Sequence, residues 1–417
     1  MKKRPYDLIV VGSGAAGMTA AITAKQKCEN VLLIEQLPAL GTKLKATGGG
    51  RCNLSNTLDD LTFMNSFGKN GRFMRDALKL FNHTSLINFL SDIAVKTHIP
   101  DGFRIFPVTH NSSTIINALK DELNRLKVQI KCSTKVEELL YEDEKIVAVK
   151  TANESFFSKN VIIATGGLGY PMLGANGDGY DFASKLNHKV TPLYPAMIPL
   201  KTKETWVGAC RADTIPKACI KIDLPKAKKL KATGDLIFTS KGIRGPVVLD
   251  FAREITPFLE KYKEVPLLIN LTKGMNENDI FAHLKQEIKK NPQATVLETI
   301  STLLPSSVAE QLVILSGANI KQSFNKQDGE IRNKIVKNLA WTPLTVVGHD
   351  GFKKAMITRG GISLKDINPK TMQSKHIKGL YFCGEVVDLD GPCGGYNLQW
   401  SFSSGYLAGQ LLKEFKI

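Results

Sequence analysis

The sequence predicts an α/β protein in which a Rossmann-type domain is interrupted by an insert, and three observations favour this fold. Residues 6–35 run from an apolar strand through a Gly-x-Gly-x-x-Gly turn and a short helix to a second strand that ends in an acid. Two further apolar strands, within residues 161–167 and 379–385, also end in small-residue turns. No such motif occurs between Pro192 and about Lys353. Because the strands of one parallel sheet must meet, we expect the two ends of the chain to form one domain.

Each glycine of the first turn has a separate task, and together they predict dinucleotide binding. Gly12 permits the tight turn, Gly14 lets a pyrophosphate approach the backbone, and Gly17 lets the helix pack closely on the strand. The N-terminus of that helix offers free N–H groups to the phosphates. Glu35 ends the second strand eighteen residues after Gly17, where its carboxylate can accept both hydroxyls of the adenosine ribose. The alternative is a glycine-rich turn in an ordinary α/β sheet.

The later motifs indicate that the dinucleotide is FAD rather than NAD. Gly394 and Gly395 open a helix that is expected to reach about Leu412. A helix N-terminus aimed at the N1–C2=O side of an isoalloxazine stabilises the negative charge that appears there on reduction. Glu385 or Asp388 can bind ribityl hydroxyls. Because no second Gly-x-Gly-x-x-Gly lies between a strand and a helix, any NAD(P)H must approach the flavin transiently.

A glycine-rich loop at residues 41–53 is less usual. Three consecutive glycines precede Arg51 and allow the backbone to lie flat against a ring and to offer N–H groups to a phosphate or a flavin edge. Arg51 could neutralise a pyrophosphate or bind an anionic substrate. The alternative is a surface loop with an exposed arginine. Cys52 is interpreted as a packed thiol rather than a nucleophile.

The insert changes character along its length. From Met197 to Leu271 short β-rich runs alternate with Gly/Pro turns, which is typical of a small barrel. Apolar residues then recur at helical spacing, at Ile280, Phe281, Leu284 and Ile288. We expect the substrate site in the cleft between this insert and the FAD domain. The expected division is a discontinuous FAD-binding domain at residues 1–193 and 354–417, and an insert at 194–353 that is barrel-like at 194–272 and 340–353 and helical at 273–339.

Several motifs resemble those of the HI0933-like flavoprotein family, and the resemblance spans nearly the whole chain. They are Thr-Gly-Gly-Gly-Arg-Cys-Asn at 47–53, the segments Thr233–Thr239, Gly242–Pro246, Thr358–Gly361 and Thr371–Lys375, and Gly-Pro-Cys-Gly-Gly-Tyr-Asn-Leu-Gln-Trp at 391–400. The resemblance implies an NAD(P)/FAD-dependent or aminoacetone-oxidase-like oxidoreductase. It also implies a glutathione-reductase-like FAD domain and an insert made of a β-barrel and a helical subdomain. Arg244 departs from the family pattern, in which a small Ser usually occupies this position.

The resemblance and the motifs together assign the following residues to FAD. They are Gly12, Ser13, Gly14, Ala15, Ala16, Gly17, Glu35, Gln36, Lys43, Thr47, Gly48, Gly49, Gly50, Arg51, Cys52, Asn53, Val136 in a hairpin-like stretch, Ala164, Thr165, Gly166, Gly384, Glu385, Gly394, Gly395, Tyr396, Asn397 and Leu398.

The net charge of +17 raises the question of an anionic partner. Between Lys201 and Lys263 there are 14 Lys and Arg against 7 Asp and Glu, with the densest part at residues 226–231. Such a face could attract nucleic acid, an anionic membrane surface or an acidic substrate. The favoured interpretation is a solvated strand edge, because no aromatic residue interleaves the run as a single-strand stacking platform would require. A nucleic-acid partner is therefore not expected, although it stays open.

The cysteines and the hydropathy bear on location. Seven cysteines are an odd number and show no spacing suited to zinc, so we expect no metal site and a reducing compartment. No uncharged apolar stretch is long enough to cross a membrane, and the glycines of the first turn argue against a signal peptide. The expected location is cytoplasmic.

The predicted function is that of an FAD-dependent oxidoreductase. It would exchange a hydride between flavin N5 and a small or medium organic substrate, with NAD(P)H as a conceivable transient donor. One alternative is a flavoprotein that acts on RNA, as tRNA-modifying enzymes do. Another is a non-catalytic FAD-binding sensor. The sequence assigns neither a catalytic acid or base nor an oligomeric state.

Overall fold

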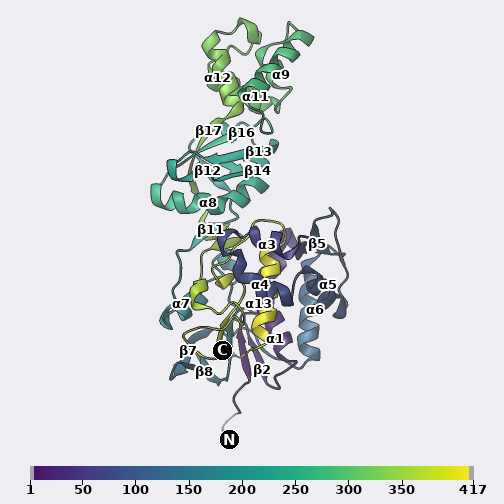
Figure 1. Ribbon diagram of the computed structural model, residues 1–417, viewed down its shortest axis with the longest axis vertical. Coiled ribbons are helices and arrows are strands. Elements are labelled where there is room, and N and C mark those ends of the chain that lie inside the picture. Colours follow the sequence, from purple (N-terminus) through teal and green to yellow (C-terminus); the bar gives the residue numbers. More distant parts are fainter. Residues whose placement is uncertain (1–3, 413–417) are drawn as a thin grey trace. The chain divides into compact units, whose positions relative to one another are not determined.

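The computed structural model describes residues 4–412, which divide into two compact units (Figure 1). One unit runs as far as Leu193 and resumes at Ile357, and the other covers Tyr194–Met356. Each has a hydrophobic core of its own. The predicted fold class, a Rossmann-type domain interrupted by an insert with a barrel and helices, is confirmed. No helix among residues 4–412 combines the length and the apolar character needed to cross a membrane.

The first unit is built on a parallel sheet of five strands in the order β19-β10-β1-β2-β6. The strands nearest the centre are buried throughout, since helices and loops cover both faces of such a sheet. The last strand in the sequence, β19, pairs with β10 and so closes the sheet from the far end of the chain. The strands are β1 (Leu8–Val11), β2 (Val31–Ile34), β6 (Gln129–Lys131), β10 (Val161–Ile163) and β19 (Leu380–Phe382).

Two helices from opposite ends of the chain pack against each other in this unit. Helix α1 (Ala15–Ala24) and helix α13 (Tyr396–Gly409) lie side by side (Figure 1). A Cβ on Gly405 would stand 2.3 Å from the Ala16 carbonyl oxygen, and one on Gly409 would stand 2.5 Å from the Ala20 oxygen. Glycine is therefore required at both positions for the helices to approach this closely.

The remaining elements of the first unit surround the sheet. The stretch expected to be hairpin-like is a three-stranded antiparallel meander. The elements are β7 (Val136–Glu142), β8 (Lys145–Thr151), β9 (Ser155–Phe157), the small sheet of β3 (Ser55–Asn56), β5 (Arg104–Pro107) and β4 (Thr97–His98), strand β18 (Ile357–Arg359), and helices α2 (Thr42–Ala46), α3 (Asp60–Asn65), α4 (Arg75–Leu80), α5 (His83–Asp92), α6 (Ser112–Arg125) and α7 (Asp178–Lys185).

The second unit contains a closed barrel of six strands in the order β12-β15-β14-β13-β16-β17. Alternate residues of its strands face the core, which is the period of two that the sequence indicated. Helix α8 was not expected, because its Gly245-Pro246 start resembles another turn. Pro246 occupies the first turn of that helix, where a missing N–H costs nothing. The elements are β11 (Tyr194–Ala196), β12 (Leu200–Thr202), β13 (Thr214–Ile222), β14 (Lys231–Thr239), β15 (Gly242–Arg244), α8 (Pro246–Tyr262), β16 (Val265–Asn270) and β17 (Thr342–His349).

Four helices occupy the sequence between β16 and β17. In α9, Ile280 and Leu284 are buried as predicted, whereas Phe281 is 40% exposed and the ammonium of Lys285 lies over its ring. The expectation for Phe281 was wrong because one residue along a helix turns the side chain by about 100° away from the apolar stripe. The helices are α9 (Glu277–Lys290), α10 (Val296–Ile300), α11 (Ser306–Ser316) and α12 (Gly329–Ala340).

Candidate flavin site

The first glycine turn has the geometry of a phosphate-binding loop. Gly12 has a φ of +100°, and a Cβ there would stand 2.5 Å from the Ala164 carbonyl oxygen. A Cβ on Gly17 would stand 1.9 Å from the Gly12 oxygen. Gly14 differs, because no atom lies within 4 Å of where its Cβ would be. Packing within the protein therefore requires Gly12 and Gly17, while Gly14 faces open space that a phosphate group can fill.

Helix α1 begins directly after that open space. Its N-cap is Gly14, and no side chain caps it. Ala15 and Ala16 are buried and nonpolar, so the first backbone N–H groups meet no competing side-chain acceptor. An uncapped helix start beside a glycine is a ready anion site. This part of the structure fits the pyrophosphate of a dinucleotide.

Glu35 is tied to the glycine turn. One of its carboxylate oxygens accepts hydrogen bonds from the backbone N–H (2.9 Å) and the hydroxyl (2.5 Å) of Ser13, and the other accepts from the N–H of Leu37 (2.9 Å). A carboxylate has about four acceptor positions, so capacity for a ribose hydroxyl remains. The next residue, Gln36, donates to the Gly174 carbonyl oxygen at 2.7 Å and accepts from Asn176 at 2.9 Å.

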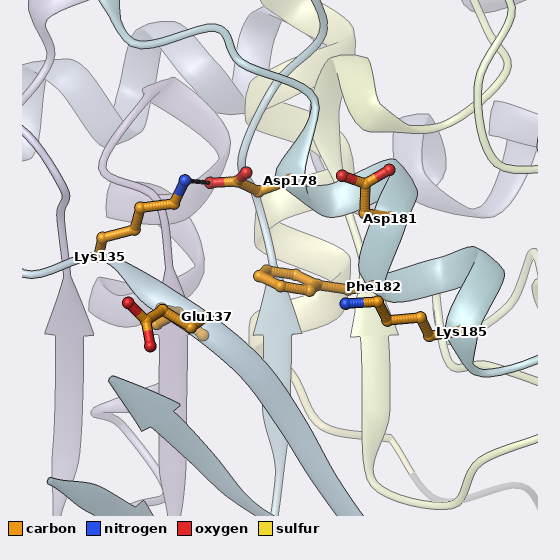
Figure 2. A pocket seen from close by; sticks show the side chains of 7 residues that line it. Lys135, Glu137, Asp178, Asp181, Phe182 and Lys185 are labelled. Atoms are coloured by element: carbon orange, nitrogen blue, oxygen red, sulfur yellow. Dashed lines mark ion pairs between the residues drawn. The ribbon is translucent and has the colours of Figure 1, made fainter. Parts of the chain in front are cut away.

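Val136 lines a recess between β7 and α7 (Figure 2). The recess has a volume of about 190 Å³. Lys135 and Asp178 form an ion pair at 3.3 Å across it, and the ring of Phe182 lies between the charged side chains (Figure 2). The recess is thus lined mainly by charged side chains, and Val136 and Phe182 are its apolar lining residues. The lining residues are Lys135, Val136, Glu137, Asp178, Asp181, Phe182 and Lys185.

The turn after β10 lies next to the glycine turn, since Ala164 contacts Gly12. Thr165 has a buried hydroxyl, and Gly166 has a φ of +73° with open space on its Cβ side. A Cβ on Gly384 would stand 2.9 Å from the Ala16 side chain. The strands β1, β10 and β19 therefore deliver three predicted glycine turns to one edge of the sheet.

An ion pair that sequence reasoning missed joins two of the predicted residues. The Lys43 ammonium lies 2.8 Å from the Glu385 carboxylate, and both side chains are about four-fifths buried, with exposures of 24% and 19%. The second oxygen of Glu385 accepts from the backbone N–H of Thr358 at 3.0 Å. These residues are far apart in sequence, so only the fold could pair them. Burial raises the pKa of nearby Asp388 above its usual range.

The loop at Thr47–Asn53 is shaped by left-handed backbone. Gly48, Gly49 and Gly50 have φ values of 58°, 65° and 88°, and Cys52, which is not a glycine, has a φ of 60°. Cys52 is fully buried, and this burial raises the pKa of its thiol to about 12. A thiol with that pKa is not a nucleophile at neutral pH, which agrees with the packed-thiol interpretation. Arg51 is exposed.

The loop at Thr47–Asn53 contacts the start of α13 through Asn53. With its amide oriented so that both groups are satisfied, the Asn53 side chain donates to the Ser55 carbonyl oxygen and accepts from the Gly395 N–H, each at 3.1 Å. A Cβ on Gly395 would clash with Ser55 at 2.4 Å, so glycine is required there. Helix α13 has no side-chain cap at Gly395. Its free N–H groups are therefore available to a negatively charged ring edge.

The first residues of α13 hold the preceding loop in place. Asn397 accepts from the Gly391 N–H at 2.8 Å and donates to the Gly391 carbonyl oxygen at 2.9 Å. Tyr396 is buried and packs against Phe63, with ring centres 5.0 Å apart. Leu398 is partly buried against the core. The polar and aromatic side chains at this position are thus used for support, and the backbone N–H groups remain for a ligand.

Comparisons with known proteins agree with this geometry. The model of the HI0933-like protein Rossmann domain matches residues 6–411. A 3-dehydro-bile acid delta(4,6)-reductase of Clostridium scindens is 31% identical over 409 residues, which cover 97% of this chain and 98% of that protein. A ribosomal RNA dihydrouridine synthase of Haemophilus influenzae is 30% identical over 411 residues, covering 95% and 96% of the two chains.

A solved structure shares the fold at low sequence identity. The 3-ketosteroid delta1-dehydrogenase of Sterolibacterium denitrificans has a TM-score of 0.53 at 12% identity, covering 97% of this chain and 99% of that one. The fold and the site define a Rossmann-type flavoprotein, an oxidoreductase whose cofactor is FAD. More particularly, the chain belongs to the HI0933-like family, as its motifs indicated.

Proposed function

We propose that this flavoprotein reduces a carbon–carbon double bond that is conjugated to a carbonyl group. The observation that carries the proposal is that the two relatives described above act on the same type of double bond. A delta(4,6)-reductase of a 3-dehydro-bile acid acts on double bonds conjugated to the 3-keto group. Forming dihydrouridine saturates the C5=C6 bond of uracil, which is conjugated to the C4 carbonyl. The substrates differ in size and charge, whereas the electronic structure of the reacting bond is the same.

The reaction requires one hydride and one proton. When bound and reduced by the electron donor, FAD would supply the hydride to the carbon β to the carbonyl, and the α carbon would take a proton. The uncapped start of α13 would stabilise negative charge on the N1–C2=O edge. Tyr396 and Asn397 are occupied in holding that helix start, so we assign neither as the proton donor.

The proposed cofactor contacts follow from the free groups of the site. The N–H groups after Gly14 would hold the pyrophosphate, and Glu35 would hold the adenosine ribose. The Lys43–Glu385 pair would hold ribityl hydroxyls, because each member keeps polar capacity beyond the ion pair. Val136 and Phe182, the apolar lining residues of the recess, would contact the adenine end. NAD(P)H is our proposed electron donor, and it would approach transiently.

The test is product analysis under anaerobic conditions. Purified protein is incubated with NADH or NADPH and with methyl 4-oxopent-2-enoate, a small neutral enone. The expected result is the saturated keto ester in an amount equal to the nicotinamide consumed. Recovery of the unchanged enone with protein that carries FAD, from both nicotinamides and from dithionite-reduced protein, would contradict the proposal.

A second candidate narrows the substrate to a uracil base within RNA. The observation that favours it is an aromatic side chain, Trp341, which is far away in sequence but lies against the basic stretch Lys201–Lys263. The ammonium of Lys221 lies 3.6 Å from the centre of the Trp341 ring, and Lys221 pairs with Lys231 across β13 and β14. The exposed residues Lys226, Lys228 and Lys229 occupy the turn between these strands. Lysines beside a partly exposed tryptophan can bind phosphates and stack a base.

A further inference from the structure

A cluster of cations lies at the small sheet of the first unit, and of its members the sequence assigned only Arg51, as a cofactor or substrate contact. Arg51 and Arg104 both lie over the buried ring of Phe106, with guanidinium carbons 5.9 Å and 5.7 Å from its centre. The ring of His110 lies 5.5 Å from that of Phe106, and the ring of His98 lies 4.5 Å from that of His110. Arg51, Arg104 and His110 therefore surround one aromatic ring, and His98 lies against His110.

The cluster carries more positive charge than the protein itself neutralises. Arg104 pairs with Asp101 at 2.5 Å. Arg51 makes a hydrogen bond to the Gly48 carbonyl oxygen at 3.4 Å, and within residues 4–412 it has no ion pair. Two guanidinium groups held on one ring repel each other, and an anion between them would remove that repulsion. Both arginines are exposed, so such an anion can reach them.

Two residues beside the cluster have a left-handed backbone conformation. Cys52, directly after Arg51, has a φ of 60°, and His110 has a φ of 48°. Neither is a glycine, so each conformation costs stability and persists only where the surroundings enforce it. His98 has a buried Nε2 without a hydrogen-bond partner in the described chain. Buried nitrogens without a partner are rare in folded proteins, so the Nε2 of His98 calls for a partner that the described chain does not supply.

The cluster lies next to the start of α13. Asn56 donates to the Gly394 carbonyl oxygen at 2.9 Å, and in the strand pair β3–β5 it stands opposite Arg104. Phe103, one residue before Arg104, lies against Gly394. Asn56 and Phe103 thus connect Arg104 to Gly394, directly before the helix start to which we assign the flavin ring edge.

We propose that Arg51, Arg104 and His110, arranged around Phe106, form an anion-binding site that orients the substrate beside the flavin. The inference rests on the proposed function and deepens it, because it names the substrate class as a conjugated carbonyl compound that carries a carboxylate or a phosphate. The same chemistry serves a carboxylated small molecule and a nucleotide. Arg51 then acts on the substrate rather than on the pyrophosphate, which decides between the two roles that the sequence left open.

The test compares charged and neutral partners of two probe pairs by calorimetric titration of the oxidised, FAD-loaded protein. The first pair is 4-oxopentanoate and its methyl ester, and the second is uridine 5′-monophosphate and uridine. We expect at least one charged member to bind about tenfold more tightly than its neutral partner. A preference within the first pair identifies a carboxylate, and a preference within the second identifies a phosphate.

Variants assign the preference to the cluster. The double substitution R51Q/R104Q is expected to abolish the preference with FAD content unchanged, and R51Q alone to reduce it. R4Q removes an exposed arginine elsewhere in the same unit and is expected to preserve it. Equal binding of charged and neutral probes by the unaltered protein, a preference that survives in R51Q/R104Q, or loss of FAD from that variant would each overturn the inference. These titrations need no turnover, so failure to reduce an enone would count against the proposed function alone.

Discussion

The glycines of the first turn show how far single residues could be interpreted from sequence. Their order predicted three different tasks, and the distances around Gly12, Gly14 and Gly17 agree with that assignment. The environment of Glu35 was not predictable, because its bonds to Ser13 and Leu37 depend on how the turn folds back. The Lys43–Glu385 ion pair could not be predicted either, because only the fold brings these two residues together.

Two glycine substitutions in the first turn should differ in their effect on stability. G14A places a methyl group in open space at an ordinary φ of −70°, so we expect a near-normal melting temperature but loss of most bound FAD. G12A forces a φ of +100° and a contact with Ala164, and should cost about 2 kcal/mol or more of folding free energy. Thermal melts and the ratio of flavin to protein absorbance measure both effects. Full FAD content in G14A would contradict the assignment of the pyrophosphate to this turn.

A buried histidine makes stability depend on pH. His188 Nε2 lies 2.7 Å from the Ser374 hydroxyl, which itself accepts from two backbone N–H groups and so must donate its proton to the ring. Burial, and secondarily the neighbouring His376, lowers the pKa of His188 below its usual value. The unfolded chain therefore takes up a proton first as the pH falls through about 6.5, and stability declines there.

The variant H188Q isolates this contribution. It keeps a polar side chain at the site but cannot titrate, so its melting temperature should change less between pH 7 and pH 5 than that of the unaltered protein. His376 and Asp366 lie nearby, 3.2 Å apart, and remain in both proteins, which makes the comparison specific. Parallel pH profiles for the two proteins would refute the assignment.

At the scale of elements, the period of the pattern predicted the barrel strands and α9 but did not predict α8. Periodicity reports which face is buried, and a helix introduced by Gly-Pro gives the same turn signal as a strand end. The basic run shows a second limit of local patterns. Its densest part, residues 226–231, contains no aromatic residue, yet the fold brings Trp341 from the end of α12 onto Lys221.

The turn between β13 and β14 provides the test of the RNA alternative. If this turn binds RNA, reversing three charges in K226E/K228E/K229E should weaken binding of a uridine-rich oligonucleotide about tenfold or more at low salt, and W341A should weaken it further. The control K289E/K321E/K334E changes the net charge equally at exposed positions between β16 and β17. Fluorescence anisotropy measures both. If both triple variants lost the same affinity for the oligonucleotide, net charge alone would explain the effect, and a specific RNA-binding surface at this turn would be excluded.

At the scale of the whole molecule, the chain leaves one core at Leu193, completes another, and returns at Ile357. The sequence predicted this path because a strand that ends in Gly-Glu is useful only beside the first glycine turn. The chemistry of the substrate could not be predicted in this way. It depends on side chains such as Arg51, Arg104 and Phe106, which come together only in the folded unit.

The most direct measurement follows the flavin absorbance of the dithionite-reduced protein during anaerobic addition of methyl 4-oxopent-2-enoate, with the saturated keto ester as the control. Our account predicts that the yellow colour of oxidised FAD returns in proportion to the enone added and does not return with the saturated ester. Protein that stays reduced with every conjugated carbonyl compound, yet regains its colour with oxygen, would contradict the central claim.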